Sequence, residues 1–360
     1  MLFYDISRIE AENAYYNVIF GGRSSGKSDA MARLLVDSYF RTGEEFGRVL
    51  RYITDNNGMI MEGYFNSDHL RTYIREKYDR QIIYNGVYWY AVPADAEDPH
   101  DKKLPRQRIG QTFILNHEYR YKSSQFDEIT RILDEEFILM DPADYLSFEF
   151  EKFMSLVSTI NRHRDNVKCY FIGNTLNKAN PYFSGLGINL EKLNIYPGQI
   201  RTMHNRHGVK YAIEYAEMSY RNLDEIPMIL KIDGNEIATE GDFVTDPNVY
   251  PPEMIERIMS RGDPVYLCSL LYRSLEYRVY KIRITDRVNG FCIIRRWEKY
   301  GGKNKTLIRL DNRLIDIDPV SGGTLDYLLQ FGYDTRVTVF DDDEIKYALI
   351  TALRHWKNSV

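Results

Sequence analysis

The sequence is poor in cysteine, carries no excess of basic residues and contains no long apolar run. Only 3 of its 360 residues are cysteines, and they lack CxxC spacing, so we expect reduced core thiols rather than a disulfide framework or a zinc site. The formal net charge of −5 does not attract nucleic acid, so any DNA binding needs a local basic lining. Asp5, Arg8 and Glu10 interrupt the N-terminus before a signal-peptide core could form. We therefore expect a soluble, intracellular protein without a membrane span, long enough for two domains.

The most informative stretch is Tyr16–Phe40, where a short apolar run leads into Gly21-x-x-x-x-Gly26-Lys27-Ser28 and then into an amphipathic helical pattern. Strand, glycine-rich loop and helix form the context in which backbone N–H groups surround phosphate oxygens. In such a loop Lys27 reaches the β and γ phosphates of ATP, and the Ser28 hydroxyl ligates Mg²⁺. A chance match of a Gly/Ser turn is the alternative. The expected nucleotide-binding residues are Gly21, Gly22, Arg23, Ser24, Ser25, Gly26, Lys27 and Ser28.

An acidic group follows the apolar strand expected at residues 129–133. We expect Asp134 to hold Mg²⁺ opposite Ser28 and Glu135 to act as the general base on the attacking water. Glu136 competes for the base role, and an acidic surface loop is the alternative. A small-molecule kinase needs the aspartate but not the adjacent glutamate, so the pair favours an ATPase.

Hydrolysis also needs positive charge at the transition state, which a neighbouring subunit can supply as an arginine finger. Arg162 and Arg164 follow an expected helix and precede the next strand, where they could equally serve the helix dipole. Arg23 could act within the subunit instead. Asn174, expected at a strand end, is placed to sense the γ-phosphate, although such a residue is as often a turn residue.

The remaining pattern predicts a parallel α/β domain followed by a smaller α+β unit. Asn85-Gly86 predicts a hairpin between strands near 81–84 and 87–91, and the polar segment 93–108 is more typical of a solvated loop than of a DNA contact. We divide the chain into an ATPase domain (1–200), a linker subdomain (201–258) and a C-terminal domain (259–360). Further strands are expected at 46–53, 109–115, 168–172, 277–284, 291–297 and 306–310, and helices at 63–78, 148–161 and 344–357.

Several segments together resemble the DNA-packaging ATPases of small protein-primed podophages, the terminase-like motors that pump genomic DNA into a prohead. They are GGRSSGKS, LDEE, INRHRDNVKCYFIGNTLNKANPYF and YAEMSY. The resemblance implies an additional-strand, conserved-glutamate ATPase fold joined to a C-terminal domain of vestigial, RNase H-like nuclease type. It also implies a homopentameric ring that acts on double-stranded DNA in the host cytoplasm and docks transiently on the portal vertex of the procapsid.

The resemblance also assigns roles to single residues. It makes Lys27 and Ser28 the Walker A pair and Asp134 and Glu135 the Walker B pair. Arg162, rather than Arg164, matches the trans-acting arginine finger of the family. Asn174 lies in the coupling motif, and Lys122 matches a Lys-Ser step before Walker B. The 93–108 loop resembles an insertion, and 138–145 offers no lysine for DNA.

A large terminase with an active C-terminal nuclease is the alternative function, and a protein that binds nucleotide only to assemble is a third. A nuclease needs clustered carboxylates, one of them in the first central strand. The strand expected at 277–284 carries three cations and no acid, and we read Asp341–Asp343 as helix-capping charge. We therefore expect an ATP-driven DNA translocase without nuclease activity.

Overall fold

The computed structural model of the chain forms two compact units, which are considered separately. The first is built mainly from residues before 244 and the second mainly from residues after it. No helix in the described part of the chain is long and apolar enough to cross a membrane. The structure describes residues 4–22, 25–53, 58–139, 144–175, 178, 180–216, 252–261, 264–272, 275–285, 288–295, 307–311, 314–316, 338–340, 345, 346, 348 and 349.

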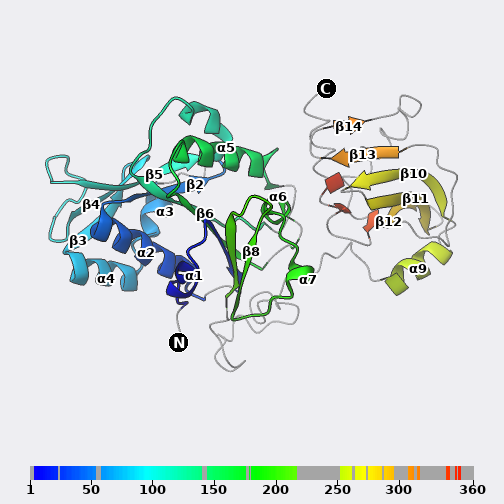
Figure 1. Cartoon of the computed structure of the whole chain (residues 1–360), viewed down its shortest axis with the longest axis horizontal. Helices are drawn as coiled ribbons and strands as arrows, with labels where there is room; N and C mark the ends of the chain where they lie inside the picture. Colours follow the sequence, from blue (N-terminus) through cyan, green and yellow to red (C-terminus); the bar gives the residue numbers. More distant parts are fainter. Residues whose placement is uncertain are drawn as a thin grey trace. The chain divides into compact units, whose positions relative to one another are not determined.

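The first unit is organised around a nine-stranded sheet with the order β3-β4-β5-β2-β6-β7-β1-β9-β8 (Figure 1). The strands from β5 to β9 in this order are parallel to their neighbours, and antiparallel pairs flank them on both sides. The fold of this unit is therefore mixed α/β with a mainly parallel central sheet, as expected. The strands are β1 (Tyr16–Gly21), β2 (Glu45–Leu50), β3 (Arg80–Tyr84), β4 (Tyr88–Pro93), β5 (Gln107–Ile114), β6 (Ile129–Glu135), β7 (Lys168–Asn174), β8 (Gln199–His204) and β9 (Lys210–Tyr215).

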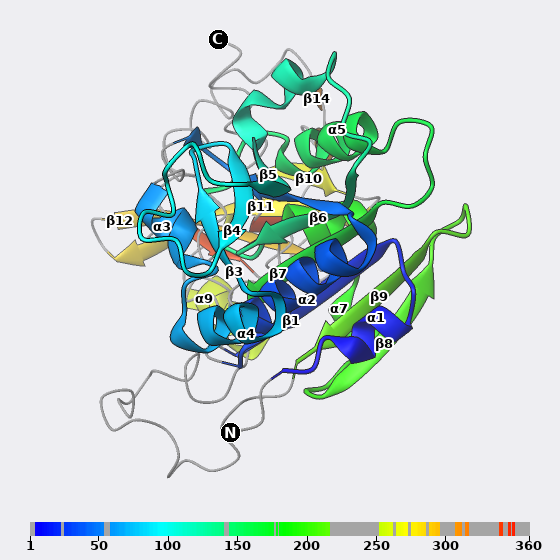
Figure 2. The ribbon, with the colours of Figure 1, turned by 90° about the vertical axis from the view of Figure 1, so that its left-hand side faces the viewer.

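Helices cover both faces of this sheet. Helices α2 and α4 lie side by side, as Figure 2 shows, whereas α5 contacts the 3-10 helix η2, α6 and β6. Helix α2 begins after Gly26 and ends before Gly43, and both glycines have the positive φ that favours glycine at helix ends. The helices of this unit are α1 (Ser7–Ala11), α2 (Lys27–Thr42), α3 (Gly58–Gly63), α4 (Asp68–Tyr78), η2 (Leu115–Tyr121), α5 (Glu149–Asn161), α6 (Pro181–Leu186) and α7 (Leu190–Leu193).

The two faces have separate cores, because successive side chains of a strand point to opposite sides. On the face covered by α2, Leu133 of β6 packs in one apolar cluster with Met31 and Leu35. On the face covered by α5, Phe171 of β7 contacts Phe153 at a ring-centroid distance of 4.9 Å. Two consecutive residues at a strand end therefore point one toward α2 and the other toward α5.

Several local predictions for this unit are confirmed. Strands β3 and β4 form the expected hairpin, with the Asn85 side chain accepting hydrogen bonds from Val87 N and Tyr88 N. Cys169 is a buried free thiol, as are the two cysteines of the second unit, Cys268 and Cys292. One segment lies elsewhere than expected: β9 pairs with β1, although we placed it in a linker subdomain beginning at 201. A strand's place in a sheet depends on distant partners, which the local pattern does not contain.

The second unit holds a six-stranded sheet with the order β14-β13-β10-β11-β12-β15. Strands β11, β12 and β13 correspond to the expected strands, and β10 precedes them without having been predicted. Most of the helix expected at 344–357 lies outside the described residues. The elements are α9 (Pro252–Arg261), β10 (Val265–Tyr272), β11 (Leu275–Thr285), β12 (Val288–Arg295), β13 (Leu307–Asp311), β14 (Leu314–Asp316) and β15 (Thr338–Phe340).

Candidate active site

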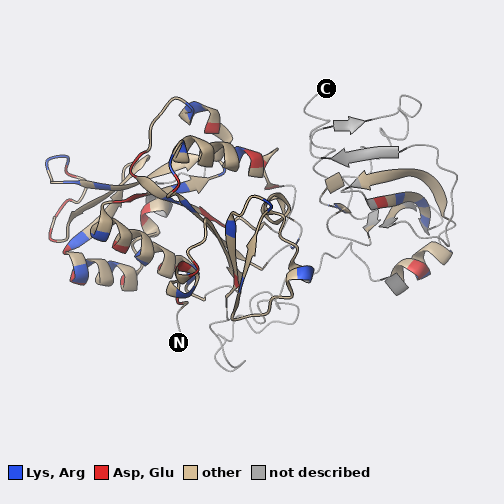
Figure 3. Ribbon diagram, in the orientation of Figure 1, with Lys and Arg blue, Asp and Glu red and all other residues tan. Residues whose placement is uncertain are grey.

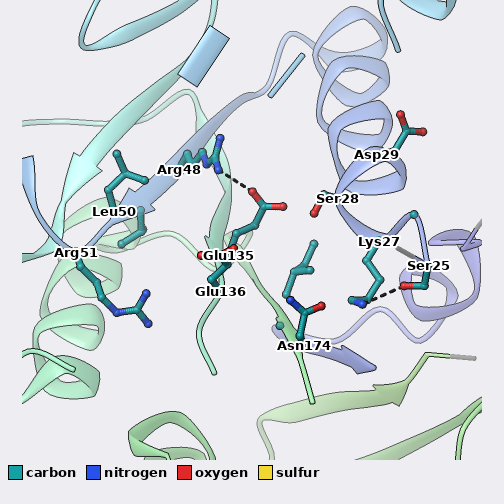
Figure 4. Close-up of a pocket in the computed structure, with 14 residues that line it drawn as sticks. Ser25, Lys27, Ser28, Asp29, Arg48, Leu50, Arg51, Glu135, Glu136 and Asn174 are labelled. Carbon is teal, nitrogen blue, oxygen red and sulfur yellow. Dashed lines mark hydrogen bonds and ion pairs between the residues drawn. The ribbon is translucent and has the colours of Figure 1, made fainter. Parts of the chain in front are cut away.

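A cavity of about 470 Å³ opens at the carboxyl ends of the central strands, where β1 turns into α2 (Figure 4). Ligands of open α/β sheets bind at this edge. Most of the lining is polar. The lining residues are Ser25, Gly26, Lys27, Ser28, Asp29, Arg48, Val49, Leu50, Arg51, Glu135, Glu136, Ile172, Gly173 and Asn174.

The glycine-rich loop has the backbone that a phosphate cradle requires. Gly26 is left-handed at φ 85°, which turns the chain into α2 and aims the unpaired N–H groups of the helix start at the cavity. A Cβ atom on Gly21 would lie 2.7 Å from the carbonyl oxygen of Ala216, so β1 can approach the end of β9 only through a glycine. Gly22 belongs to the same loop, whereas Arg23 and Ser24 lie outside the described residues.

The Lys27 ammonium is held inside this loop. It donates to Gly22 O at 2.7 Å, to Ser25 Oγ at 3.0 Å and to Gly21 O at 3.3 Å. Burial lowers the pKa of Lys27 to about 8. A bound phosphate could replace these neutral acceptors. It would form charge-assisted hydrogen bonds with the buried ammonium and compensate its positive charge.

Glu135 faces the cavity from β6, on the side of the sheet that α2 covers. Its carboxylate lies near the Ser28 side chain and forms an ion pair with Arg48 at 2.8 Å (Figure 4). The Arg48 guanidinium also lies 4.1 Å from the ring centroid of Tyr64. Burial raises the pKa of Glu135, and Arg48 opposes this rise. A carboxylate is thus fixed beside the hydroxyl that was expected to ligate Mg²⁺.

Asp134 does not line the cavity. It precedes Glu135 on β6, so its side chain points to the opposite face of the sheet, where it lies against Tyr182. Burial raises the pKa of Asp134 to about 7, and Arg51 is the main opposing influence. The expected position of this carboxylate opposite Ser28 is therefore not found in this structure.

Arg51 connects the cavity to the face that holds Asp134. It follows β2, lines the cavity and contacts Glu149 of α5 through two nitrogens, at 2.9 and 3.1 Å. Tyr182 of α6 donates to the same glutamate at 2.9 Å. The Glu149 side chain is fully buried, so water does not compete for its contacts with Arg51. Helices α5 and α6 are thereby joined to the cavity by hydrogen-bonded side chains.

Two further expected residues lie at the cavity. Asn174 is the last residue of β7, and Figure 4 shows it beside Lys27. Glu136 also lines the cavity, at a positive φ of 58°, with its N–H donating to Ile172 O. Both glutamates named as possible bases therefore reach the same space.

Arg162 and Lys122 lie together at the other edge of the sheet. Arg162 donates to the carbonyl oxygen of Lys122 at 3.0 Å, and both side chains are absent from the cavity lining. The neighbouring Arg164 contacts Ile129, the first residue of β6, whereas Glu135 is the last. About 20 Å of strand separates these two ends. An arginine side chain is too short to cross that distance, so Arg162 cannot complete the cavity of its own subunit.

The residues at the cavity fit a hydrated magnesium ion. Among the described residues no group of three or more His, Cys, Asp or Glu side chains could hold a metal ion. Mg²⁺ commonly binds through one or two protein oxygens together with substrate phosphates and water. The Ser28 hydroxyl supplies such an oxygen, and the adjacent Glu135 carboxylate could accept hydrogen bonds from the water molecules of the ion.

Sequence reasoning gave no role to Arg48, Tyr64, Arg51, Glu149 or Tyr182. The two arginines were visible on a strand near the loop, but their partners belong to strands and helices far away in sequence. Only the order of β2, β6 and β7 in the sheet brings these groups together.

Comparison with known proteins gives a family. The model of the family described as Podovirus DNA encapsidation protein (Gp16) matches residues 1–201. The "DNA packaging protein" of Bacillus phage PZA and that of Bacillus phage phi29 are each 26% identical over 239 residues, which is 61% of this chain. The match spans 65% of the length of each relative.

Two solved structures share the fold over nearly the whole chain. The Phi-28 gp11 DNA packaging motor aligns with a TM-score of 0.58 at 14% identity, over 98% of both chains. The bacteriophage Phi-29 viral genome packaging motor assembly aligns with a TM-score of 0.55 at 18% identity, over 98% of this chain and 100% of that one.

Proposed function

The chain belongs to the podovirus DNA encapsidation protein (Gp16) family, and on this premise we propose that it hydrolyses ATP to move double-stranded viral DNA into a procapsid. The observation that carries the proposal is the cavity in which Lys27 and Glu135 lie on either side of Ser28. A protein that binds nucleotide only to assemble has no need of a carboxylate fixed at that hydroxyl. Because the relatives are DNA packaging proteins, we propose that the energy of ATP hydrolysis drives DNA packaging.

In the proposed reaction each residue of the cavity has a separate task. Lys27 and the N–H groups at the start of α2 bind the phosphates, and Ser28 would hold Mg²⁺. The ion would neutralise charge on the transferred phosphoryl group. Glu135 accepts the proton of the attacking water, and Asn174 orients that water or the γ-phosphate. The arrangement supports Glu135, rather than Asp134, as the carboxylate nearest to the metal.

The positive charge at the transition state comes from another copy of the chain. We assign Arg162 as the arginine finger and place Lys122 beside it in the neighbour's site, because both lie on the edge remote from their own cavity. A homo-oligomeric ring on the portal vertex, pentameric in the family resemblance, brings one such edge to each cavity. We place the ring in the host cytoplasm and transiently on the procapsid.

The DNA contact is sequence-independent and salt-sensitive, since phosphates provide the binding groups. Both signs of charge are interspersed over α2 and α4 in the view of Figure 3, in keeping with the net charge of −5. A basic lining that faces the ring pore provides the attraction in this proposal.

The C-terminal unit is proposed to be a degenerate RNase H-like domain without nuclease activity. Its strand β10 is central, antiparallel to β11 and parallel to β13. A metal-dependent nuclease would need clustered acids at such strands; β10 (VYLCSLLY) has none, and β11, which was expected to carry none over 277–284, begins earlier and includes the single acid Glu276. Ser269 of β10 is fully buried and donates to Glu276 at 2.7 Å. The alternative, a terminase with an active nuclease, predicts metal-dependent nicking of plasmid by the intact protein.

The test is ATP hydrolysis with and without double-stranded DNA, combined with DNA uptake into procapsids. We expect DNA to stimulate hydrolysis and Lys27→Ala to abolish both hydrolysis and uptake, because the substitution removes the phosphate-binding cation. Lys192→Ala, an exposed lysine of α7 outside the cavity, is the control. Hydrolysis that ignores DNA, or uptake that survives Lys27→Ala, would refute the proposal.

A further inference from the structure

Arg162 and Arg164 are two residues apart and both partly buried, but their side chains are held differently. The Arg162 side chain donates to one carbonyl oxygen, that of Lys122, through an exposed contact. Arg164 donates to four backbone carbonyl oxygens and is partly buried. A side chain with that many backbone bonds is not available to a neighbouring subunit.

The four acceptors of Arg164 come from two separate parts of the chain. One is the carbonyl of Ile160 at the end of α5, at 2.6 Å. The others precede or begin β6: Phe126 O at 3.0 Å, Ile129 O at 3.1 Å and Asp127 O. One terminal nitrogen, Nη2, lies within hydrogen-bond distance of three of these oxygens, and Nη1 reaches the fourth, whereas a lysine ammonium is a single compact donor. Arg164 therefore fastens the end of α5 to the start of β6.

The turn that carries Arg162 is short and conformationally unusual. Arg162 has φ 36° and ψ −137°, outside the regions that most residues adopt, and its N–H donates to Ser158 O. The N–H of Arg164 donates back to Arg162 O at 2.6 Å and to Asn161 O at 2.9 Å. A strained residue keeps its conformation only when surrounding bonds enforce it. The bonds of Arg164, on both its backbone and its side chain, supply that enforcement.

We propose that Arg164 is a positioning residue for the arginine finger: it fixes the 161–165 turn so that Arg162 is presented to the nucleotide of the neighbouring subunit. This inference rests on the proposed function, because it assumes that Arg162 acts in trans. Arg164 touches neither the nucleotide nor the neighbour. Its effect is on a site in another copy of the chain.

The conservative variant Arg164→Lys tests this role. A misplacement of about 1 Å at a catalytic group costs about 10²-fold in rate, so we expect kcat for DNA-stimulated hydrolysis to fall between about 10- and 100-fold. The KM for ATP and the binding of a fluorescent ATP analogue should stay unchanged, because the variant's own cavity is intact. Arg71→Lys is the control and should retain the full rate, because Arg71 is an exposed arginine that pairs with the exposed Asp68.

Mixed rings then separate a trans role from a general structural one. Lys27→Ala subunits lack a working cavity but carry an intact finger. Mixing them with Arg164→Lys subunits should give more hydrolysis than the two separate proteins together, because variant cavities then face intact fingers. Failure to gain activity on mixing, or an Arg164→Lys ring at the wild-type rate, would overturn the proposal.

The same mixing experiment with Arg162→Ala separates the trans role of Arg162 from the positioning role of Arg164. If Arg162→Ala is complemented by Lys27→Ala but Arg164→Lys is not, the trans finger stands and the positioning role falls. If neither is complemented, the trans site itself falls, and the positioning role with it. Should Arg164→Lys fail to fold, Arg164→Ala is assayed with added guanidinium: restored hydrolysis supports the role, and restored folding without restored hydrolysis overturns it.

Discussion

Replacing Glu135 with glutamine tests whether Glu135 is the general base. Glu135 and Asp134 point to opposite faces of β6, and only Glu135 lines the cavity. Glutamine keeps the shape of the side chain and a hydrogen-bond acceptor for Arg48 but cannot take a proton from water. General-base catalysis contributes about 10²- to 10⁴-fold, so kcat should fall by that factor, equivalent to about 3–5 kcal/mol of barrier.

The structure indicates that this loss is not caused by unfolding. The substitution weakens one ion pair, whose Arg48 and Glu135 side chains are 14% and 10% exposed, and Arg48 keeps its contact with the Tyr64 ring. A hydrogen bond to a charged group contributes about 1.5–3 kcal/mol, less than the 5–15 kcal/mol stability of a typical domain. The variant should therefore still fold and bind nucleotide, with hydrolysis alone reduced.

Asp134→Asn is the matched comparison, one residue away on the opposite face. We expect kcat to fall less than about tenfold, because this side chain points to the other face of the sheet and is absent from the cavity lining. The Mg²⁺ concentration for half-maximal activity should not change. Phosphate release measured over a Mg²⁺ titration gives both quantities. An Asp134→Asn protein as inactive as Glu135→Gln, with a higher Mg²⁺ requirement, would refute the reasoning from strand faces. A Glu136→Gln protein that is inactive while Glu135→Gln keeps its turnover would move the base to Glu136.

Two other substitutions have defined outcomes. Glu149→Gln leaves the Arg51 cation without its buried partner, which typically costs about 3–5 kcal/mol; because Asp134 still attracts Arg51, we expect the lower end in urea unfolding. Glu128→Gln, whose exposed side chain lies 3.8 Å from Arg108, should change stability by less than about 1 kcal/mol, and equal effects would contradict the burial argument. Gly21→Ala should lower both the melting temperature and ATP-analogue binding, since its Cβ would lie 2.7 Å from Ala216 O. Gly63→Ala, with open space around it, should leave both unchanged, and a harmless Gly21→Ala would show that β1 can move away from β9.

Local sequence patterns were sufficient for much of the site. The strand, glycine-rich loop and helix around Lys27 carry their geometry within a few residues, and Asn174 could be placed because parallel strands end at one edge. The hairpin at Asn85 is equally local.

The missing parts depend on long-range partners. Each acid of β6 points to one face of the sheet, but the pattern LDEE does not indicate which of the two faces α2 covers. Arg48 meets Glu135 only because β2 lies next to β6. Strand β7, which comes after both in sequence, lies between β6 and β1, so the acids and the loop are not on adjacent strands. The proximity of Lys122 to Arg162 likewise arises from tertiary structure alone.

The separation of Arg162 from its own cavity has a consequence for counting active sites. Subunits that place Arg162 at the cavity of the next subunit associate head to tail, because the two contact surfaces differ. Under the proposed trans role of Arg162, an open row of n subunits contains n − 1 complete sites, with an unmatched cavity at one end and an unmatched arginine at the other. Closure of the row removes both ends at once, so the rate per subunit should rise with assembly and reach its maximum only in a closed ring.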